Sequence, residues 1–499
     1  MVKFSGRNVL IVSGRKINSF ALTLESVNYL KQSGSKVLYL DLDVFASPIS
    51  KKRIYRNQIL KNLQVKKLTN PIGLTLKNML LSGRITLDWY SSAQKSANAW
   101  NHGERTLNLP LNKIVKSLLA RSMGSSQFEL SECNKNHVYK LAFDTVFAFL
   151  QTQSILDRIP KDSCIDLGVA HGGRDAYSAG AVSLFRRENI QTRLLELGGV
   201  SNRWSVFEHS PHYSPDFWRK ISDTDDELFD QRLIAGWWDK RLKGADHFRS
   251  ENWQNSRDLG VLPALLPQHF ITFFSSSDFE IPIFEDFDVF PDEFKNQFRA
   301  LEILSELASL NSIHLVIRRH PNSVDKFGVD REIDSWKKYF NLPNVTYIGP
   351  NEKIDTLLLA KLSKVVFTYK SSVGIEAIWL GVSAFALGPA RWAWHSKLRA
   401  WNKTEIEQVL KFGILPQKKD ASKWAAMMLN IDFECQVFRE IAGNYASYGS
   451  VILRNSSASE FCDKLMRRLI IANSRIRIFF RKHTTFVNQS FNKSNLTGI

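Results

Sequence analysis

Strand-like apolar segments alternate with helix-like segments in two separate parts of this chain, and this alternation restricts its fold more than any other feature. In the first part, residues 8–14 and 36–44 are expected strands on either side of an expected helix at 20–32. The pattern resumes with expected strands at 164–170 and 192–197. Strands that alternate with helices build a parallel sheet that helices cover on both faces. We therefore predict an α/β fold.

A second alternating region begins near residue 268. Its expected strands are 269–277, 313–321, 344–349, 364–369 and 382–388, with helices near 292–310, 354–362 and 371–381. A chain of 499 residues is too long for one ordinary hydrophobic core. We predict two facing Rossmann-like domains, one over 1–258 and one over 259–430, followed by C-terminal helices and a basic tail over 431–499. Within the first domain, residues 203–258 are rich in tryptophan and charge and are expected to link the two halves.

The net charge of +18 is concentrated in two segments. Residues 51–125 hold fourteen Lys or Arg against two acidic residues, and residues 464–483 hold seven with no acidic residue. We interpret 51–125 as a basic insertion, because it shows no clear periodicity. Concentrated positive charge predicts an anionic partner, and an anionic membrane surface fits best. The alternative is a solvated face that aids solubility. Nucleic acid is not an expected partner, because the basic segments contain no recognisable reading module.

The location of the chain is predicted from its cysteines and its hydropathy. The four cysteines are widely scattered and form no paired motif, which is typical of a reduced cytoplasmic protein. No uninterrupted apolar segment reaches the roughly 18 residues of a membrane-spanning helix. Together with the basic segments, these features predict a cytoplasmic protein bound peripherally to the inner face of the cytoplasmic membrane.

Two groups of polar residues in the second half follow expected strands. Arg318, Arg319 and His320 come just after one strand, and Lys370, Ser371 and Ser372 lie between another strand and a helix. Ligands of parallel sheets bind beyond the carboxyl ends of the strands, and a helix N-terminus favours anions. A nucleotide phosphate fits there, with His320 or Arg318 supplying a charge-assisted hydrogen bond.

Glu376 lies in the first turns of the same helix and could accept hydrogen bonds from ribose hydroxyls. Ordinary serine capping and a solvated histidine would explain either group alone. Both groups together, each at a strand end of one domain, favour a donor site formed by Arg318, His320, Lys370, Ser371, Ser372 and Glu376. Trp392 and Trp394 follow the last strand, where they could stack on a ligand or pack in the core.

The same segments carry a family resemblance. HFITFFSSSDFE, RRHPN and TYKSSVGIEAIWLGVSAFALGPARWAW resemble the donor domain of bacterial capsule polysaccharide biosynthesis glycosyltransferases, a group that includes Kdo transferases. Related motifs occur in bacterial sialyltransferases and teichoic-acid glycerophosphotransferases. The resemblance covers roughly residues 265–400. It implies a fold of the GT-B type, with His320, Ser371 and Ser372 in contact with donor phosphate, and it favours a CMP-sugar over a UDP-sugar or CDP-glycerol.

A weaker resemblance extends over residues 170–199, which are similar to an acceptor-domain segment with an Asn-Gly-Arg loop and a downstream glutamate. Here the loop is His171-Gly172-Gly173-Arg174, which departs from that pattern. Transfer of a sugar needs a base near the acceptor hydroxyl. His171, Asp175 and Glu196 are the candidates, since each follows or closes an expected strand, although Asp175 could simply cap its helix.

No metal or cofactor is predicted. Asp41 and Asp43 have the Asp-x-Asp spacing of metal-dependent sugar transferases, but they lie in the first domain, away from the expected donor site. The sequence thus predicts a metal-independent glycosyltransferase, with the acceptor on the first domain and the nucleotide-sugar on the second. A polysaccharide or a lipid-linked glycan is the expected acceptor. A sugar-nucleotide epimerase of the same fold and a non-catalytic polysaccharide assembly or export protein are the alternatives.

Overall fold

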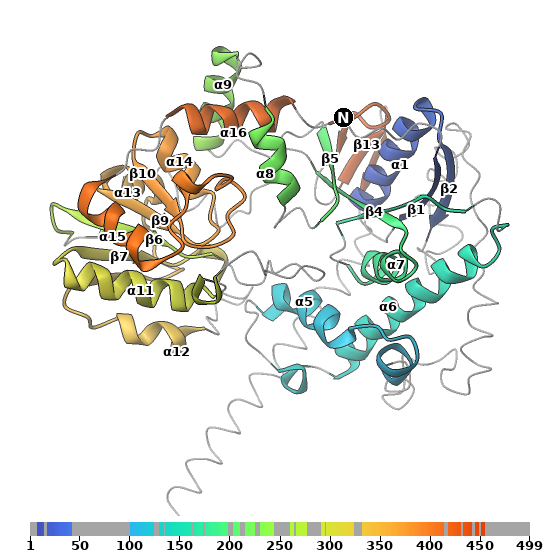
Figure 1. Ribbon diagram of the computed structural model, residues 1–499, viewed down its shortest axis with the longest axis horizontal. Coiled ribbons are helices and arrows are strands. Elements are labelled where there is room, and N and C mark those ends of the chain that lie inside the picture. The colour runs from blue at the N-terminus through green and yellow to red at the C-terminus, as the bar shows by residue number, and fades with distance from the viewer. Residues whose placement is uncertain are drawn as a thin grey trace, which may run out of the picture.

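A computed structural model of the chain contains two α/β units, each built on its own sheet (Figure 1). The structure describes residues 7–13, 17–41, 100–123, 129–133, 135–160, 164–172, 175–197, 203–209, 215–224, 230–243, 260–263, 266–276, 291–294, 296–323, 332–413, 418–430, 433–441, 445–448 and 451–454. Among these residues, no helix combines the length and the apolar character that crossing a membrane requires.

The first sheet has the strand order β11-β5-β4-β3-β1-β2. Its strands are β1 (Asn8–Ser13), β2 (Lys36–Asp41), β3 (Leu167–His171), β4 (Gln191–Leu197), β5 (Arg203–Phe207) and β11 (Phe433–Glu434). The first four run parallel, whereas β5 is antiparallel to β4 and β11 is antiparallel to β5. Because the chain order reverses between β1 and β3, this sheet has a switch point at the carboxyl ends of those two strands.

Helices cover both faces of this sheet, which explains why β1 is apolar along its length. Val9 and Ile11 pack toward α1 (Ile17–Gln32), and Leu10 and Val12 toward α6 (Lys135–Leu156) and α7 (Ala176–Arg187). Gly180 permits the close approach of α7 to α6, because a Cβ there would lie 2.2 Å from the Thr145 carbonyl oxygen.

Part of the expected basic insertion belongs to the first core. Helix α5 (Leu111–Met123) buries Leu111, Val115 and Leu119, which are spaced at helical intervals, in the same cluster as α6. The prediction that this segment lacks periodicity is therefore wrong for α5. Residues 51–99 lie outside the described part of the chain.

The second sheet has the order β10-β9-β6-β7-β8, and all five strands are parallel. They are β6 (Phe270–Phe274), β7 (His314–Arg318), β8 (Val345–Ile348), β9 (Val365–Thr368) and β10 (Ser383–Ala386). Read from β8 to β10, this is the Rossmann order, and the direction of winding reverses between β6 and β9. The predicted α/β class with two Rossmann-like sheets is confirmed.

Two sets of helices cover the second sheet. Helices α11 (Gln297–Leu310) and α15 (Lys403–Phe412) pack on one face, and α13 (Thr356–Leu362), α14 (Val373–Trp379) and α16 (Lys418–Asn430) pack on the other. The short helix α12 (Ile333–Trp336) follows β7 and buries Trp336 on the α11 side.

The segment expected to be a linker contributes to both units. Strand β5 joins the first sheet, whereas α8 (Pro215–Ser222) and α9 (Gln231–Leu242) pack beside α16 on the second unit (Figure 1). The indole N–H of Trp218 donates to the Ala390 carbonyl at 3.0 Å, and that of Trp238 donates to the Ala421 carbonyl at 3.3 Å.

The chain then returns to the first unit after α16. Helices are expected from residue 431, but the described residues form β11 and a small antiparallel sheet beside α1. This sheet consists of β12 (Glu440–Ile441), β13 (Tyr445–Tyr448) and β14 (Val451–Arg454). The residues after 454, including the basic tail, lie outside the described part of the chain.

A buried carboxylate on α1 holds the returning segment. Glu25 is 1% exposed, and its two oxygens accept from the backbone N–H groups of Gln436, Val437 and Phe438 at 2.8, 2.9 and 2.7 Å. These bonds satisfy three amides that lie between the two-residue strands β11 and β12. The first unit thus depends on residues more than 400 positions apart in the chain.

Candidate functional site

The candidate site lies at the carboxyl ends of β6, β7 and β9, beside the switch point of the second sheet. Three loops begin there, and they carry Ser275 and Ser276, then His320, then Lys370 to Ser372. The strand order brings them together, since β6 pairs with both β7 and β9. Crevices at such switch points bind nucleotides in open parallel sheets.

Two buried serines join these loops to one another. The Ser275 hydroxyl accepts from the backbone N–H of His320 at 2.8 Å, and the Ser276 hydroxyl accepts from that of Lys370 at 2.7 Å. Gln297 fixes the serine loop in turn, because its side-chain amide bonds both the N–H and the carbonyl of Ser276. Ser275, Ser276 and Gln297 are absent from the sequence-predicted site, although the serine run directly after the β6 strand could have indicated the first two.

The Ser371–Ser372 turn is supported by a tryptophan. The indole N–H of Trp392 donates to the Ser371 carbonyl at 2.9 Å, and its ring lies against Gly374, where a Cβ would come within 2.1 Å. Trp392 and Trp394 are 1% and 8% exposed and belong to the core cluster. The structure therefore favours core packing for both tryptophans over stacking on a ligand.

The two arginines that precede His320 contact the protein itself. Both are buried, at 2% and 0% exposure. The Arg318 guanidinium donates to the carbonyls of Gly349 and Glu352 in the loop after β8. The Arg319 guanidinium lies over the Trp336 ring, 4.3 Å from its centroid, and 3.6 Å from the Glu332 carboxylate. Arg318 was predicted to bind the nucleotide-sugar donor. In this structure it instead holds the loops after β7 and β8 together.

The sequence predicts that His320 or Arg318 makes a charge-assisted hydrogen bond to phosphate, but the surroundings of His320 disfavour a charged ring. Burial and, next, the positive charges of Arg318 and Arg319 lower its pKa to about 4. The ring is therefore neutral at pH 7 when no anion is bound. A neutral imidazole still has one N–H to donate.

Glu376 lies beneath the serine turn and is fully buried. Its Oε1 is 3.0 Å from Nη2 of Arg241, which comes from α9, and it also accepts the Ser372 hydroxyl at 3.3 Å. The predicted contact of Glu376 with ribose stays a prediction, and its carboxylate is engaged within the protein here.

Of the three candidate catalytic residues of the first unit, His171 and Glu196 lie near each other, whereas Asp175 caps a helix. Nε2 of His171, at the end of β3, lies 4.0 Å from Oε1 of Glu196, near the end of β4. Asp175 instead begins α7, where one oxygen accepts from the N–H groups of Tyr177 and Ser178 and the other accepts the Ser178 hydroxyl at 2.8 Å. This is the capping alternative that the sequence leaves open for Asp175.

The turn after β3 contains a glycine in the left-handed region. Gly172 has φ +54°, a conformation that a side chain would strain, and it leaves the β3 turn close to Glu196. Gly173 and Arg174 lie outside the described residues. Asp41 ends β2, while Asp43 lies outside them, so their Asp-x-Asp arrangement has no described geometry.

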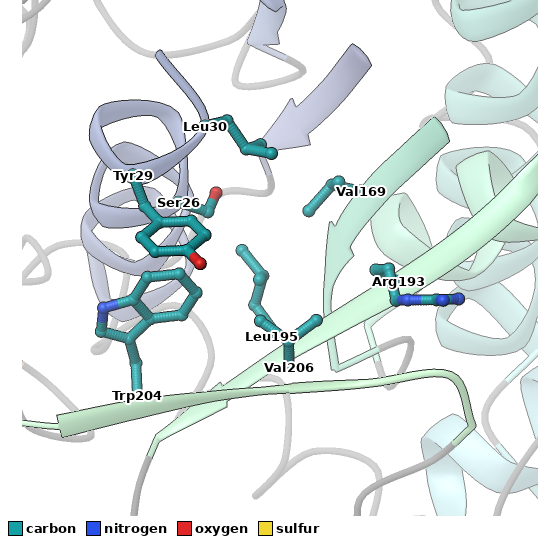
Figure 2. A pocket seen from close by; sticks show the side chains of 8 residues that line it. All are labelled: Ser26, Tyr29, Leu30, Val169, Arg193, Leu195, Trp204 and Val206. Carbon is teal, nitrogen blue, oxygen red and sulfur yellow. The ribbon is translucent and has the colours of Figure 1, made fainter. Parts of the chain in front are cut away.

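An apolar pocket of the first unit lies between α1 and the sheet (Figure 2). Tyr29 and Trp204 form one wall, and Val169 and Leu195 lie on the opposite side. Arg193 points its guanidinium away from this space and pairs with Glu208 at 2.5 Å. The pocket therefore offers no charged group to a phosphate.

Comparisons with known proteins give no family. No protein-family model matches the sequence, and no curated protein matches it. Solved structures similar to the chain include a Thermosulfurimonas dismutans KpsC β-Kdo 2,4-transferase (13% identity, TM-score 0.32, covering 52% of this chain and 87% of that chain). They also include a Methanocaldococcus jannaschii UDP-GlcNAc 2-epimerase (11% identity, TM-score 0.28, covering 84% and 99%) and the glycotransferase of kitacinnamycin (11% identity, TM-score 0.25, covering 85% and 95%). Similarities of this size assign no activity to the chain.

Proposed function

We propose that this chain is a metal-independent glycosyltransferase of the GT-B type that transfers a sugar from a nucleotide donor to a capsule or other surface polysaccharide. The observation that carries the proposal is the switch point of the second sheet, where Ser275, Ser276, His320 and the Ser371–Ser372 turn gather from three loops. Hydroxyl, imidazole and backbone N–H donors at such a position suit a nucleotide phosphate. The resemblance of RRHPN and TYKSSVGIE to capsule transferases supports a CMP-sugar as donor.

The chemistry proposed for the first unit uses its histidine–carboxylate pair. His171 takes the proton of the acceptor hydroxyl, and Glu196 stabilises the imidazolium that forms. The acceptor oxygen bonds to the anomeric carbon of the sugar, and the bond between that carbon and the phosphate oxygen breaks. The nucleotide leaves with the electron pair of that bond, and hydrogen-bond donors of the second unit stabilise its phosphate.

A thermal-shift panel on the full chain tests the donor site. CMP, CDP and UDP are each added at increasing concentration, and the preferred nucleotide should raise the Tm. A ligand present at a hundred times its Kd stabilises the folded state by about 2.7 kcal/mol. The Ser371→Ala/Ser372→Ala pair should abolish most of this shift. If none of the three nucleotides stabilises the wild-type chain at millimolar concentration, the donor-site proposal fails.

The two alternatives have distinct outcomes. An epimerase would convert a free UDP-sugar with no acceptor present, whereas the proposed transferase releases nucleotide only when acceptor is added, apart from slow hydrolysis. A non-catalytic assembly protein would bind nucleotide and release none. Transfer should persist in EDTA, because the proposal includes no metal or cofactor.

We also propose that the basic segments bind the enzyme to the cytoplasmic face of an anionic membrane, where a lipid-linked acceptor would be available. The tail combines the seven positive charges of 464–483 with apolar residues, as interfacial helices do. Each Lys or Arg near an anionic leaflet contributes about 1 kcal/mol. The competing interpretation is that the tail packs on the first domain.

Vesicle co-sedimentation distinguishes these interpretations. Binding should require anionic lipid, fall with added salt, and weaken when residues 464–499 are removed. Equal recovery with neutral and anionic vesicles would exclude an electrostatic anchor.

A further inference from the structure

The two serines at the start of α14 look equivalent in the sequence, but the structure gives them opposite hydrogen-bonding roles. Both are half-buried and lie side by side after β9. A serine hydroxyl has one proton to donate and two lone pairs to accept with. The direction in which each proton is committed within the protein therefore decides what each serine can offer to a ligand.

The proton of Ser372 is committed inward. Its hydroxyl makes no capping bond to the helix backbone and instead donates to Oε1 of Glu376 at 3.3 Å. An ionised carboxylate can only accept, so the hydroxyl must be the donor in this pair. The lone pairs of Ser372 then remain to accept hydrogen bonds from another group.

Arg241 fixes this direction. Its Nη2 lies 3.0 Å from the same Oε1, and the two side chains of the ion pair are 10% and 0% exposed. A guanidinium has only donors, so this Oε1 accepts from Arg241 as it does from Ser372. The guanidinium itself lies over the Trp237 ring, 5.2 Å from its centroid, within α9.

Ser371 is arranged the other way. Its hydroxyl oxygen accepts from the backbone N–H of Val373 at 3.4 Å, and among the described residues it donates to no protein acceptor. Its proton is therefore available to a ligand. A phosphate oxygen, which only accepts, can bond this proton, but it has no such proton to bond at Ser372.

We propose that Ser371 donates to the phosphate of the nucleotide, whereas Ser372, held by the Arg241–Glu376 pair, accepts from a ribose hydroxyl. Arg241 is a positioning residue that was not predicted from the sequence, and it lies on α9, which packs on the second unit. This inference rests on the proposed donor site. In this proposal Glu376 does not contact the sugar, and it affects ribose binding by orienting the Ser372 hydroxyl.

Calorimetry on the full chain with paired ligands tests this division. The probes are CMP and its 2′,3′-dideoxy analogue, with UMP and its 2′,3′-dideoxy analogue run in parallel. Ser371→Ala should weaken both members of a pair by the same factor. Ser372→Ala should weaken the ribonucleotide by about five- to tenfold, the size of one hydrogen bond, and leave the dideoxy analogue unchanged. The variant loses binding free energy for the ribonucleotide and for its dideoxy analogue. The difference between these two losses is the coupling energy between the Ser372 side chain and the ribose hydroxyls.

Arg241 variants test the positioning role. Arg241→Lys should retain part of the preference for ribose, and Arg241→Met should remove it. Because breaking a buried ion pair can unfold a protein, Arg241→Met/Glu376→Leu is added, since apolar replacement of both partners is often tolerated. This double variant should fold and bind phosphate but treat ribose and dideoxy nucleotides alike.

The outcomes separate the two proposals. If the wild-type chain binds none of these nucleotides, the proposed function fails. If it binds them but Ser372→Ala weakens both members of a pair equally, or neither, Ser372 does not accept from ribose and the inference is overturned. A wild-type chain that binds ribose and dideoxy nucleotides equally well also overturns it.

Discussion

The carboxyl edges of the two sheets use polar side chains in different ways. At the second sheet, Ser275 and Ser276 join loops from three neighbouring strands, and those loops carry the residues that we propose to face a ligand. At the first sheet, Asp175 caps a helix, and the His171–Glu196 contact at 4.0 Å is the described arrangement suited to proton transfer. One edge is a set of mutually bonded loops, whereas the described residues of the other edge contribute a histidine–carboxylate pair.

This difference suggests a division of work between binding and reaction. Loops that are bonded to one another hold donors in fixed positions, which suits recognition of a phosphate whose geometry does not change. A histidine 4.0 Å from a carboxylate can move closer to it when an acceptor arrives, and catalytic contacts often tighten only in the substrate complex. Variants at each edge should therefore affect different kinetic quantities.

The largest expected effect is on turnover. His171→Ala should lower kcat by roughly two to four orders of magnitude, because the acceptor hydroxyl loses its base. Glu196→Gln should have a smaller effect, since it leaves the imidazole in place without its negative partner. Donor affinity, measured by calorimetry, should stay within about twofold of wild type for both variants. A strong loss of donor affinity would show that the two edges are not separate in function.

Asp175→Ser is the matched control for the capping role. Serine is also a good N-cap, so this variant keeps the hydrogen bonds to α7 while it removes the carboxylate. Wild-type turnover and stability would confirm that Asp175 acts as a cap. A loss of turnover with unchanged stability would instead identify Asp175 as the base and leave His171 a structural neighbour.

The next effect is on the stability of the first unit and concerns Glu25, which lies outside the candidate site. Glu25→Ala should lower the free energy of unfolding by about 3 kcal/mol, because it leaves three amides of residues 436–438 without their acceptor. Urea unfolding measures this change in the free energy of unfolding. Glu293→Ala, at an exposed position of the second unit, is the control. A loss below 1 kcal/mol would show that the returning segment is held mainly by its apolar contacts.

The pH dependence of this effect has a definite sign. Burial raises the pKa of Glu25 above its ordinary 4.5, despite the three N–H groups that lower it. The folded chain thus keeps the proton to a higher pH than the unfolded chain does, so this stabilising contribution is complete below the unfolded pKa and is lost as pH rises through the folded one. The stability deficit of Glu25→Gln relative to wild type should therefore shrink as the pH rises from about 4 to 7.

The alternation of strands and helices predicted both sheets, because parallel strands covered on both faces are apolar along their length, as β1 is. The same rule missed α5, since the basic residues between Leu111, Val115 and Leu119 hide its apolar stripe. It also missed the strands after α16. The segment that leads into them is bonded to Glu25, which lies far away in the chain, and no local pattern records such a contact.

For the candidate site, the sequence predicted where its residues lie in the fold but not which groups they contact. His320 and the two serines follow their strands as expected, and the loops meet because β6 lies between β7 and β9. Sequence cannot tell that Arg318 turns toward the carbonyls after β8, or that Glu376 meets Arg241 from α9. In both cases the partner is set by tertiary packing.

The smallest expected effect, at neutral pH, is that of His320. Because burial and Arg318 and Arg319 hold its pKa near 4, His320→Ala should weaken nucleotide binding only about fivefold at pH 7.5, the size of one neutral hydrogen bond. A bound phosphate favours the charged ring and raises its pKa, so binding takes up a proton as the pH falls. The ratio of wild-type to variant affinity should therefore grow by about tenfold between pH 7.5 and 5.5, and comparing the two proteins cancels titration of the ligand itself. Calorimetry in two buffers of different ionisation enthalpy measures the proton uptake directly. A ratio that stays constant with pH would mean that the phosphate does not lie beside His320, and that the serine loops alone form the binding edge.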